Sequence, residues 1–316
     1  MNRLQLIKEV REALARSGFY ITDSFRDRGI SFDLVARKDE ELIVIRVLLN
    51  ADSSRVDNAN ELKRLASAIN ASPMFIAVNG GSRELEKGVV YTRRGIPLIT
   101  LETLKDMVIE GVPPYVFSAP GGFYVQLDSN LLKELRKKKQ ISLKKLAEIA
   151  GVSRKSIQKY EKGMGADLEV AIRLEEFLGG DLIMPLNPLE KAEIKEENIE
   201  SINKFKGLSR FVFESLSSFG YDVVPTCKCP FEAVTSDDDT ILLSGISNTE
   251  KEDIKNKAKI VSNLSKITEK DSVFFIKKRY TQVNIEGIPV IEKKELFKID
   301  SGEKMKELLN ERKEEN

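Results

Sequence analysis

Three side chains that could read nucleic-acid bases stand close together near the middle of the chain. Arg154, Lys155 and Gln158 occupy positions i, i+1 and i+4, so in a helix they share one face. Arginine and lysine can donate hydrogen bonds to guanine O6 and N7, and a glutamine amide can pair with adenine. Ile157 and Tyr160 would point the opposite way, into a core. The spacing therefore predicts a helix with a base-reading face.

The residues around this face have the pattern of a helix-turn-helix. A small residue, Ala147, would let two helices cross closely, and Gly151 suits a tight turn that needs positive φ. The other slots are apolar at helical spacing. The motif starts at Leu143, and its apolar slots are Leu146, Ala150, Val152, Ile157 and Tyr160. We expect its second helix to enter the major groove of double-stranded DNA.

A second group of residues is placed to contact phosphates or the margin of the reading face. Ser142 and Ser153 are the expected N-caps of the two helices, and the free amides of the first of these helices favour a phosphate. For each lysine of the group, a solvated surface position is an equal alternative, and phosphate contacts carry no sequence information. The group comprises Ser142, Lys144, Ser153, Ser156, Lys159, Lys137, Lys138 and Lys139.

Charge is distributed unevenly along the chain. The formal net charge of the whole chain is +1, from 51 basic and 50 acidic residues. Between Asp128 and Gly163, however, the chain has eleven basic residues and only four acidic ones. A basic patch inside a neutral chain is typical of a domain that binds nucleic acid.

Composition excludes several other classes. The 316 residues suggest about two or three domains, and the chain contains no histidine. This excludes Ser-His-Asp triads, Cys-His dyads and histidine zinc sites. Two cysteines, Cys227 and Cys229, are too few for a structural zinc site, so we expect reduced thiols and neither metal nor cofactor. No apolar run reaches the roughly 20 residues of a membrane span, and a cytoplasmic protein is expected.

The segments that flank the motif resemble each other. Three short matches occur in the same order: SGFYI (17–21) with FGYDV (219–223), SFDLVARKDEELIVI (31–45) with PFEAVTSDDDTILLS (230–244), and GIPLIT (95–100) with GIPVIE (287–292). Each copy is predicted to run helix, three strands, crossover helix, strand, then a further strand and helix, which makes a mixed sheet with helices packed on it. The crossover helices are expected at 56–69 and 254–267.

The fold class is therefore α/β plus all-α, with a four- to five-helix domain between two α/β units. We expect the first unit at 1–112, a linker at 113–127, the DNA-binding domain at 128–186, a linker at 187–204, the second unit at 205–300 and a charged, fraying tail at 301–316. In the central domain, a fourth helix is expected to turn Leu168, Ala171, Ile172, Leu174, Phe177 and Leu178 inward.

Two resemblances to known families make the predicted function more specific. SRKSIQKYEKG (153–163) resembles the recognition helix of the Cro/cI-type, or XRE-type, regulators. The segments FDLVAR (32–37), 43–50 and 71–76 resemble an archaeal family of HTH-type transcriptional regulatory proteins. The resemblance implies a sequence-specific DNA-binding regulator. We expect a homodimer, because one module presents few base contacts. The sequence identifies no effector.

An alternative interpretation is that the protein is a structure-specific nuclease, which the helix-turn-helix holds on DNA. The α/β units resemble the restriction-endonuclease-like fold, including archaeal Holliday-junction resolvases, whose metal site needs two carboxylates and a lysine. Asp33 fits the first position and Glu232 matches it in the second copy. Val44, however, stands where the second carboxylate belongs, and Arg46 replaces the lysine. No catalytic residue is therefore predicted. A third interpretation is that the protein is a coactivator, which acts through contacts with other proteins.

Overall fold

The computed structural model describes residues 2–23, 29–189, 202–247, 251–277 and 282–314. The chain forms two compact units, which are described separately below. Unit 1 contains Met1–Ala13, Leu48–Ser53 and Phe75–Glu190, and unit 2 contains Leu14–Val47, Ser54–Met74 and Lys191–Asn316. Most of the segment expected to be a linker at 187–204 lies outside the described residues, and its end forms the short 3-10 helix η2 (Ile202–Lys204).

The α/β part of unit 1 is built on parallel and antiparallel strand pairs. Its elements are α1 (Arg3–Arg16), η1 (Ala51–Ser53), β4 (Ser72–Gly80), β5 (Arg83–Glu84), β6 (Val89–Arg93), β7 (Ile96–Ile99) and α3 (Leu101–Val108). Strand β7 runs parallel to β4 and antiparallel to β6. Thr100 caps α3 by accepting from the Thr103 amide. On α1, Leu6 is buried, whereas Leu4 is 67% exposed.

The segment expected to be a linker at 113–127 contains two paired strands, β8 (Val116–Ala119) and β9 (Gly122–Leu127). Strand β8 is parallel to β6 and antiparallel to β9. Strand β9 also pairs with β10 (Ala166–Asp167) and β11 (Ile183–Met184). The proline and glycine content suggested a linker, but the strands pair their backbone groups and bury Val125 and Leu127.

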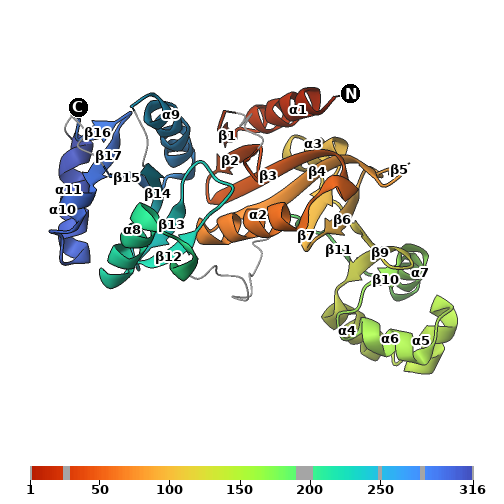
Figure 1. Ribbon diagram of the computed structural model, residues 1–316. Coiled ribbons are helices and arrows are strands. Elements are labelled where there is room, and N and C mark those ends of the chain that lie inside the picture. The colour runs from red at the N-terminus through yellow and green to blue at the C-terminus, as the bar shows by residue number, and fades with distance from the viewer. Residues whose placement is uncertain (1, 24–28, 190–201, 248–250, 278–281, 315–316) are drawn as a thin grey trace. The chain divides into compact units, whose positions relative to one another are not determined.

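The DNA-binding domain expected at 128–186 has four helices, gathered beside β9 and β10 (Figure 1). They are α4 (Ser129–Lys138), α5 (Leu143–Ala150), α6 (Arg154–Tyr160) and α7 (Leu168–Leu178). The core of the domain buries Leu132, Leu146, Ile157, Val170, Ala171, Leu174 and Leu178. Leu168, Ile172 and Phe177 were expected inside but are 39%, 41% and 37% exposed. The buried stripe of α7 runs along Val170, Leu174 and Leu178, which leaves those three side chains outside it.

Unit 2 contains a hairpin, a helix and a complete second sheet. Its first elements are β1 (Tyr20–Ile21), β2 (Leu34–Lys38), β3 (Glu41–Asn50) and α2 (Val56–Ala68), although β3 ends in unit 1. Its later elements are α8 (Gly207–Ser218), β12 (Asp222–Pro225), β13 (Ala233–Ser236), β14 (Ile241–Ser247), α9 (Lys251–Thr268), β15 (Asp271–Ile276), β16 (Asn284–Ile285), β17 (Ile288–Glu292), α10 (Lys293–Leu296) and α11 (Gly302–Glu314). The second sheet has the strand order β12-β13-β14-β15-β17-β16.

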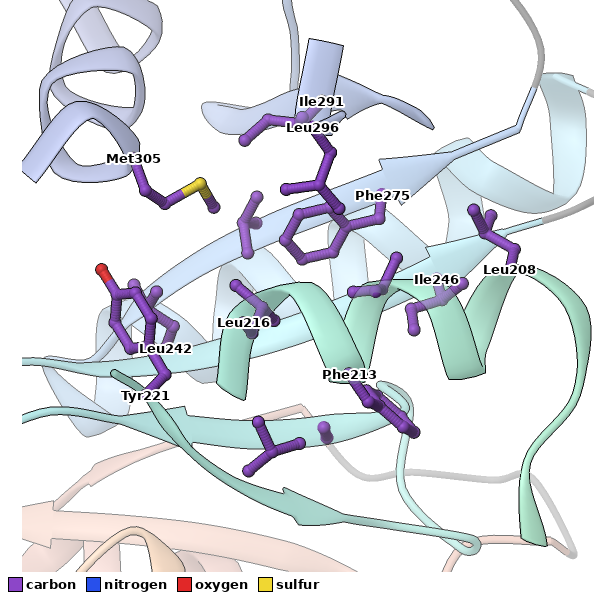
Figure 2. Packing of buried hydrophobic residues seen from close by; sticks show 14 of the residues in the cluster. Leu208, Phe213, Leu216, Tyr221, Leu242, Ile246, Phe275, Ile291, Leu296 and Met305 are labelled. Atoms are coloured by element: carbon purple, nitrogen blue, oxygen red, sulfur yellow. The ribbon is translucent and has the colours of Figure 1, made fainter. Parts of the chain in front are cut away.

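The tail at 301–316 is not a frayed end, because residues 302–314 form helix α11. Met305 of α11 is buried in the same core as Phe213, Leu216 and Phe275 (Figure 2). Leu309 of the same helix belongs to this core as well. The charge of this segment suggested fraying, but its apolar residues recur at helical spacing and one face of the helix is buried.

Ion pairs also hold α11 in place. The Lys306 ammonium lies 2.9 Å from the Asp237 carboxylate, and Arg312 pairs with Glu295. Burial raises the pKa of Asp237, but hydrogen bonds from Lys306 and Thr240 outweigh burial and lower it to about 2. Asp237 is therefore ionised at neutral pH and available to Lys306.

The two α/β regions repeat the same set of strand pairings. Leu34 pairs with Ile45 in the β2–β3 hairpin, and Ala233 pairs with Ser244 in the β13–β14 hairpin. A preceding strand, β1 or β12, is antiparallel to the first strand of each hairpin. A crossover helix follows each hairpin, and each region then has a parallel pair, β4 with β7 or β15 with β17.

Candidate nucleic-acid interface

The turn between α5 and α6 is built from the residues that the motif requires. Gly151 closes α5 in the left-handed region, with φ of 70°, a conformation in which a side chain is strained. Ala147, Ile157 and Tyr160 are buried, whereas Leu143 and Val152 are half-buried. Burial, with Asp167 and Tyr124 nearby, raises the pKa of Tyr160, so its hydroxyl stays neutral in this core.

The three predicted base-reading side chains lie together on the exposed face of α6. Arg154, Lys155 and Gln158 are all exposed, and Ile157 and Tyr160 anchor the opposite face. Within the described part of the chain, none of the three forms an ion pair or a side-chain hydrogen bond. Their donors and acceptors are therefore available to a ligand, and no internal contact has to be broken first.

Serine side chains fix where both helices begin. Ser142 accepts from the Lys145 amide at the start of α5, and Ser153 accepts from the Ser156 amide at the start of α6. The hydroxyl of Ser156 lies 2.9 Å from that of Ser153, so Ser156 belongs to the same cap. Each cap satisfies one of the amides that a helix start leaves without a partner.

The lysines predicted to contact phosphate differ in the contacts that their ammonium groups make. Lys137, Lys138, Lys144 and Lys159 are exposed. The Lys139 ammonium, in contrast, donates to the Phe177 carbonyl at 3.0 Å. It also lies 5.7 Å from the centre of the Phe177 ring. Lys139 thus ties the end of α4 to the C-terminal end of α7, where a cation is favourable.

An ion pair between α4 and Glu161, the residue that follows α6, links these two helices, and sequence reasoning missed it. Arg136 Nε lies 2.5 Å from Glu161 Oε1, and Nη2 lies 3.2 Å from Oε2. Arg136 also donates to the Ile141 carbonyl, and both charged side chains are largely buried. Bidentate geometry of this kind adds directional specificity to the contact. A clue was the acid Glu161 directly after the reading helix, in a segment that is otherwise basic.

At the place in the β2–β3 hairpin where a nuclease would bind its metal, the carboxylate of Asp33 is held by internal contacts. Asp33 is 1% exposed, and its Oδ2 accepts from the Val47 amide at 2.8 Å. Arg46 lies 3.5 Å from Asp33 Oδ1 and donates to the Ile30 carbonyl. Val44 is buried opposite Val35 in the hairpin. Within the described ranges, no group of three or more His, Cys, Asp or Glu side chains is placed to hold a metal ion.

Glu232 stands in the corresponding place in the second hairpin. Its amide donates to the Ser244 carbonyl, as the Asp33 amide donates to the Ile45 carbonyl. Its carboxylate accepts from the Ile246 amide at 2.5 Å and pairs with Lys257 of α9 at 2.6 Å. Each hairpin therefore holds one acid at this place, and a different neighbouring cation pairs with it.

The fold and this site define a helix-turn-helix protein that also carries a nuclease-like α/β domain. The family model of the PD-(D/E)XK superfamily domain matches residues 3–114, and a helix-turn-helix model matches residues 132–183. The second match covers all of α5, α6 and α7. No described helix combines the length and the apolar character that crossing a bilayer requires.

Archaeal relatives match along the whole chain and are named as candidate HTH-type transcriptional regulatory proteins. One from Methanosarcina acetivorans is 36% identical over 100% of this chain and 99% of its own length. One from Pyrococcus abyssi is 38% identical over 99% of both chains, and one from Archaeoglobus fulgidus is 33% identical over 97% of both. The chain belongs to this family of archaeal HTH-type transcriptional regulatory proteins. No solved structure matches it significantly.

Proposed function

We propose that the chain regulates transcription by binding a specific double-stranded DNA sequence, with α6 in the major groove. The observation that carries the proposal is the exposed set Arg154, Lys155 and Gln158, which has no internal partner among the described residues. These side chains match the donor and acceptor patterns of guanine and adenine edges. Phosphate contacts would come from the exposed Lys137 and Lys138 and from the N-terminus of α5. Such contacts position the protein on DNA without reading its sequence.

The active form on DNA is a homodimer. A single α6 offers three candidate base contacts, too few for the specificity that operator recognition requires. Two modules related by a two-fold axis would read two half-sites about one helical turn apart.

Selection of bound fragments from a random DNA pool tests this function directly. We expect an enriched sequence with two related half-sites, which footprinting should protect. The absence of enrichment would contradict sequence-specific binding. Little affinity for any DNA at low salt would instead favour a coactivator that acts through protein contacts, because non-specific DNA binding is strongest there.

We further propose that the flanking α/β regions are two non-catalytic copies of one unit. The repeated strand pairings and the equivalent contacts of Asp33 and Glu232 support the duplication. Loss of catalysis is supported by Val44, which supplies no metal ligand, and by Arg46. Arg46 neutralises Asp33 and cannot act as a base at neutral pH.

The match to the PD-(D/E)XK superfamily favours a nuclease as the second candidate function. We expect no Mg²⁺-dependent cleavage of duplex, flap or four-way-junction DNA, because one carboxylate cannot organise the metal and the attacking water. Gel assays with the wild-type chain and the Asp33→Ala variant check this. Cleavage by the wild type that Asp33→Ala abolishes would establish the nuclease and overturn the non-catalytic assignment.

A further inference from the structure

Unit 2 contains a reciprocal set of contacts between its two α/β parts. Helix α9 of the second part contacts β2 of the first, and helix α2 of the first part contacts β13 of the second. Strands β2 and β13 hold the same place in their hairpins, and α2 and α9 are the crossover helices. Each part therefore offers the same two elements to the other, which is the arrangement of a two-fold symmetric, self-complementary interface.

On one side of this interface, Arg37 of β2 holds the C-terminal end of α9. Its Nε donates to the Ile267 carbonyl at 2.8 Å, and its Nη2 lies 2.5 Å from Glu269 Oε1. Further along the same helix, the Asp23 amide donates to the side chain of Asn263. A cation at the last carbonyls of a helix is also favoured by the helix dipole.

On the other side, Glu61 of α2 holds a loop of the second part. The Glu61 side chain is 5% exposed, and its Oε1 accepts from the amides of Cys227 at 2.6 Å and Lys228 at 3.2 Å. Arg64 pairs with its other oxygen, which balances the buried charge. The Lys228 carbonyl in turn accepts from the Ser31 amide, so backbone and side-chain groups of both parts interlock.

The groups that hold the two parts together are not repeated, although the fold is. Buried residues align the two helices: Ala59 and Leu62 of α2 correspond to Ala258 and Val261 of α9. By this alignment, the place of Glu61 is taken in α9 by a partly buried isoleucine, Ile260. The registers of the β2–β3 and β13–β14 hairpins likewise put Ser236 where β2 has Arg37. The side chains that anchor the interface, Glu61 and Arg37, therefore come from the first part, and the second part lacks them at the corresponding positions.

We infer that the two α/β parts form an internal pseudo-dimer: the surface of α2 and β2 is a docking surface for a second copy of the same fold, and its occupant is the second part of the same chain. A protein with only one such α/β part would need a second chain to form this contact. Here, both parts belong to the same chain. Because this surface is occupied, the homodimer proposed on DNA forms through other residues.

A cleavable full-length chain tests the pairing. A protease site inserted after Lys195 divides the chain between the two parts without removing any described residue. After cleavage, the two fragments should elute together in gel filtration at low micromolar concentration. Fragments that separate would overturn the proposal.

Variants of the full chain test which contacts hold the parts. Glu61→Lys should weaken the association of the cleaved fragments at least about thirtyfold, because it replaces a buried, hydrogen-bonded carboxylate. Glu307→Lys, an equal charge change at an exposed position of α11, should have no effect. If Glu61→Lys does not fold, Arg37→Ala removes the contacts to Ile267 and Glu269 at a site nearer the surface. Association that neither variant weakens would contradict the assigned interface.

The oligomeric state distinguishes an internal pair from exchange between chains. If the contact is internal, Glu61→Lys leaves the stoichiometry of the intact protein unchanged. An intact dimer that Glu61→Lys converts to a monomer would place the contact between chains and overturn the internal pairing. DNA binding is not the readout of either test, so their failure would leave the proposed function standing.

Discussion

Replacement of Arg154 or Gln158 by alanine should weaken binding to the selected operator about tenfold or more, with little change in binding to unrelated DNA. The physical reason is that a bidentate contact to a base edge contributes roughly 1–3 kcal/mol of discrimination between sequences, whereas non-specific affinity comes from the many contacts to phosphate. Both side chains are exposed, and the core below α6 consists of other residues, so the variants should fold normally. Fluorescence anisotropy with operator and scrambled duplexes, measured at several salt concentrations, gives both affinities.

Two lysines provide controls that separate base reading from charge. Lys138→Ala should weaken binding to all sequences equally and reduce the salt dependence by about one released ion. Lys139→Ala should change that salt dependence less, because the Lys139 ammonium is held by the Phe177 carbonyl. An unchanged footprint and affinity in both Arg154→Ala and Gln158→Ala would show that another face of the domain reads the DNA.

Removal of the last helix should unfold the second α/β part. A chain that ends at Asp300 lacks Met305, which packs in the core around Phe213 and Phe275 (Figure 2), and Leu309 of the same core. Truncation of one buried Met or Leu to alanine typically costs about 2–5 kcal/mol, a large share of the roughly 5–15 kcal/mol that stabilises a domain. Circular dichroism during urea unfolding should show an early transition in the truncated chain.

Point variants keep this second test interpretable if the truncated chain is insoluble. Met305→Ala and Leu309→Ala should each lower the free energy of unfolding by about 2–5 kcal/mol. Glu307→Ala lies on the exposed face of the same helix and should stay within about 0.5 kcal/mol of the wild type. A truncated chain with an unchanged transition would mean that α11 is only loosely held, as the charge of this segment first suggested.

The position of α6 depends on groups that do not contact DNA in the proposed complex. The Arg136–Glu161 pair joins α4 to the end of the reading helix, and Lys139 joins α4 to α7. Arg136 and Lys139 come from the basic segment, so the number of basic residues in that segment overstates how many are available to phosphate. An account of affinity based on counting lysines and arginines would attribute these internal contacts to DNA.

In both hairpins of the proposed duplication, the acid is held by internal contacts. Asp33 and Glu232 each accept from a backbone amide of the neighbouring strand, and each is neutralised by a basic side chain. The cations come from different elements, Arg46 from β3 and Lys257 from α9. In the proposed duplication, the two copies therefore reached the same neutralised state by separate routes, as expected if the acid serves folding rather than catalysis.

The sequence by itself determined the features that depend on local spacing. The helix-turn-helix follows from small, glycine and apolar slots a few residues apart, and the hairpins follow from alternating apolar residues on either side of short polar turns. The exposed positions of Arg154, Lys155 and Gln158 follow from the same helical period, once Ile157 is inside. These patterns are readable because neighbours in the chain are also neighbours in space.

Only the tertiary structure decided which groups meet across long stretches of chain. It showed that Arg136 is bound to Glu161, that residues 116–127 form strands paired with β6, β10 and β11, and that the charged tail is a packed helix. It also brought Glu61 to the loop at Cys227. Each outcome depends on a partner far away in the sequence, and a charged or glycine-rich segment has the same local appearance whether that partner is present or not.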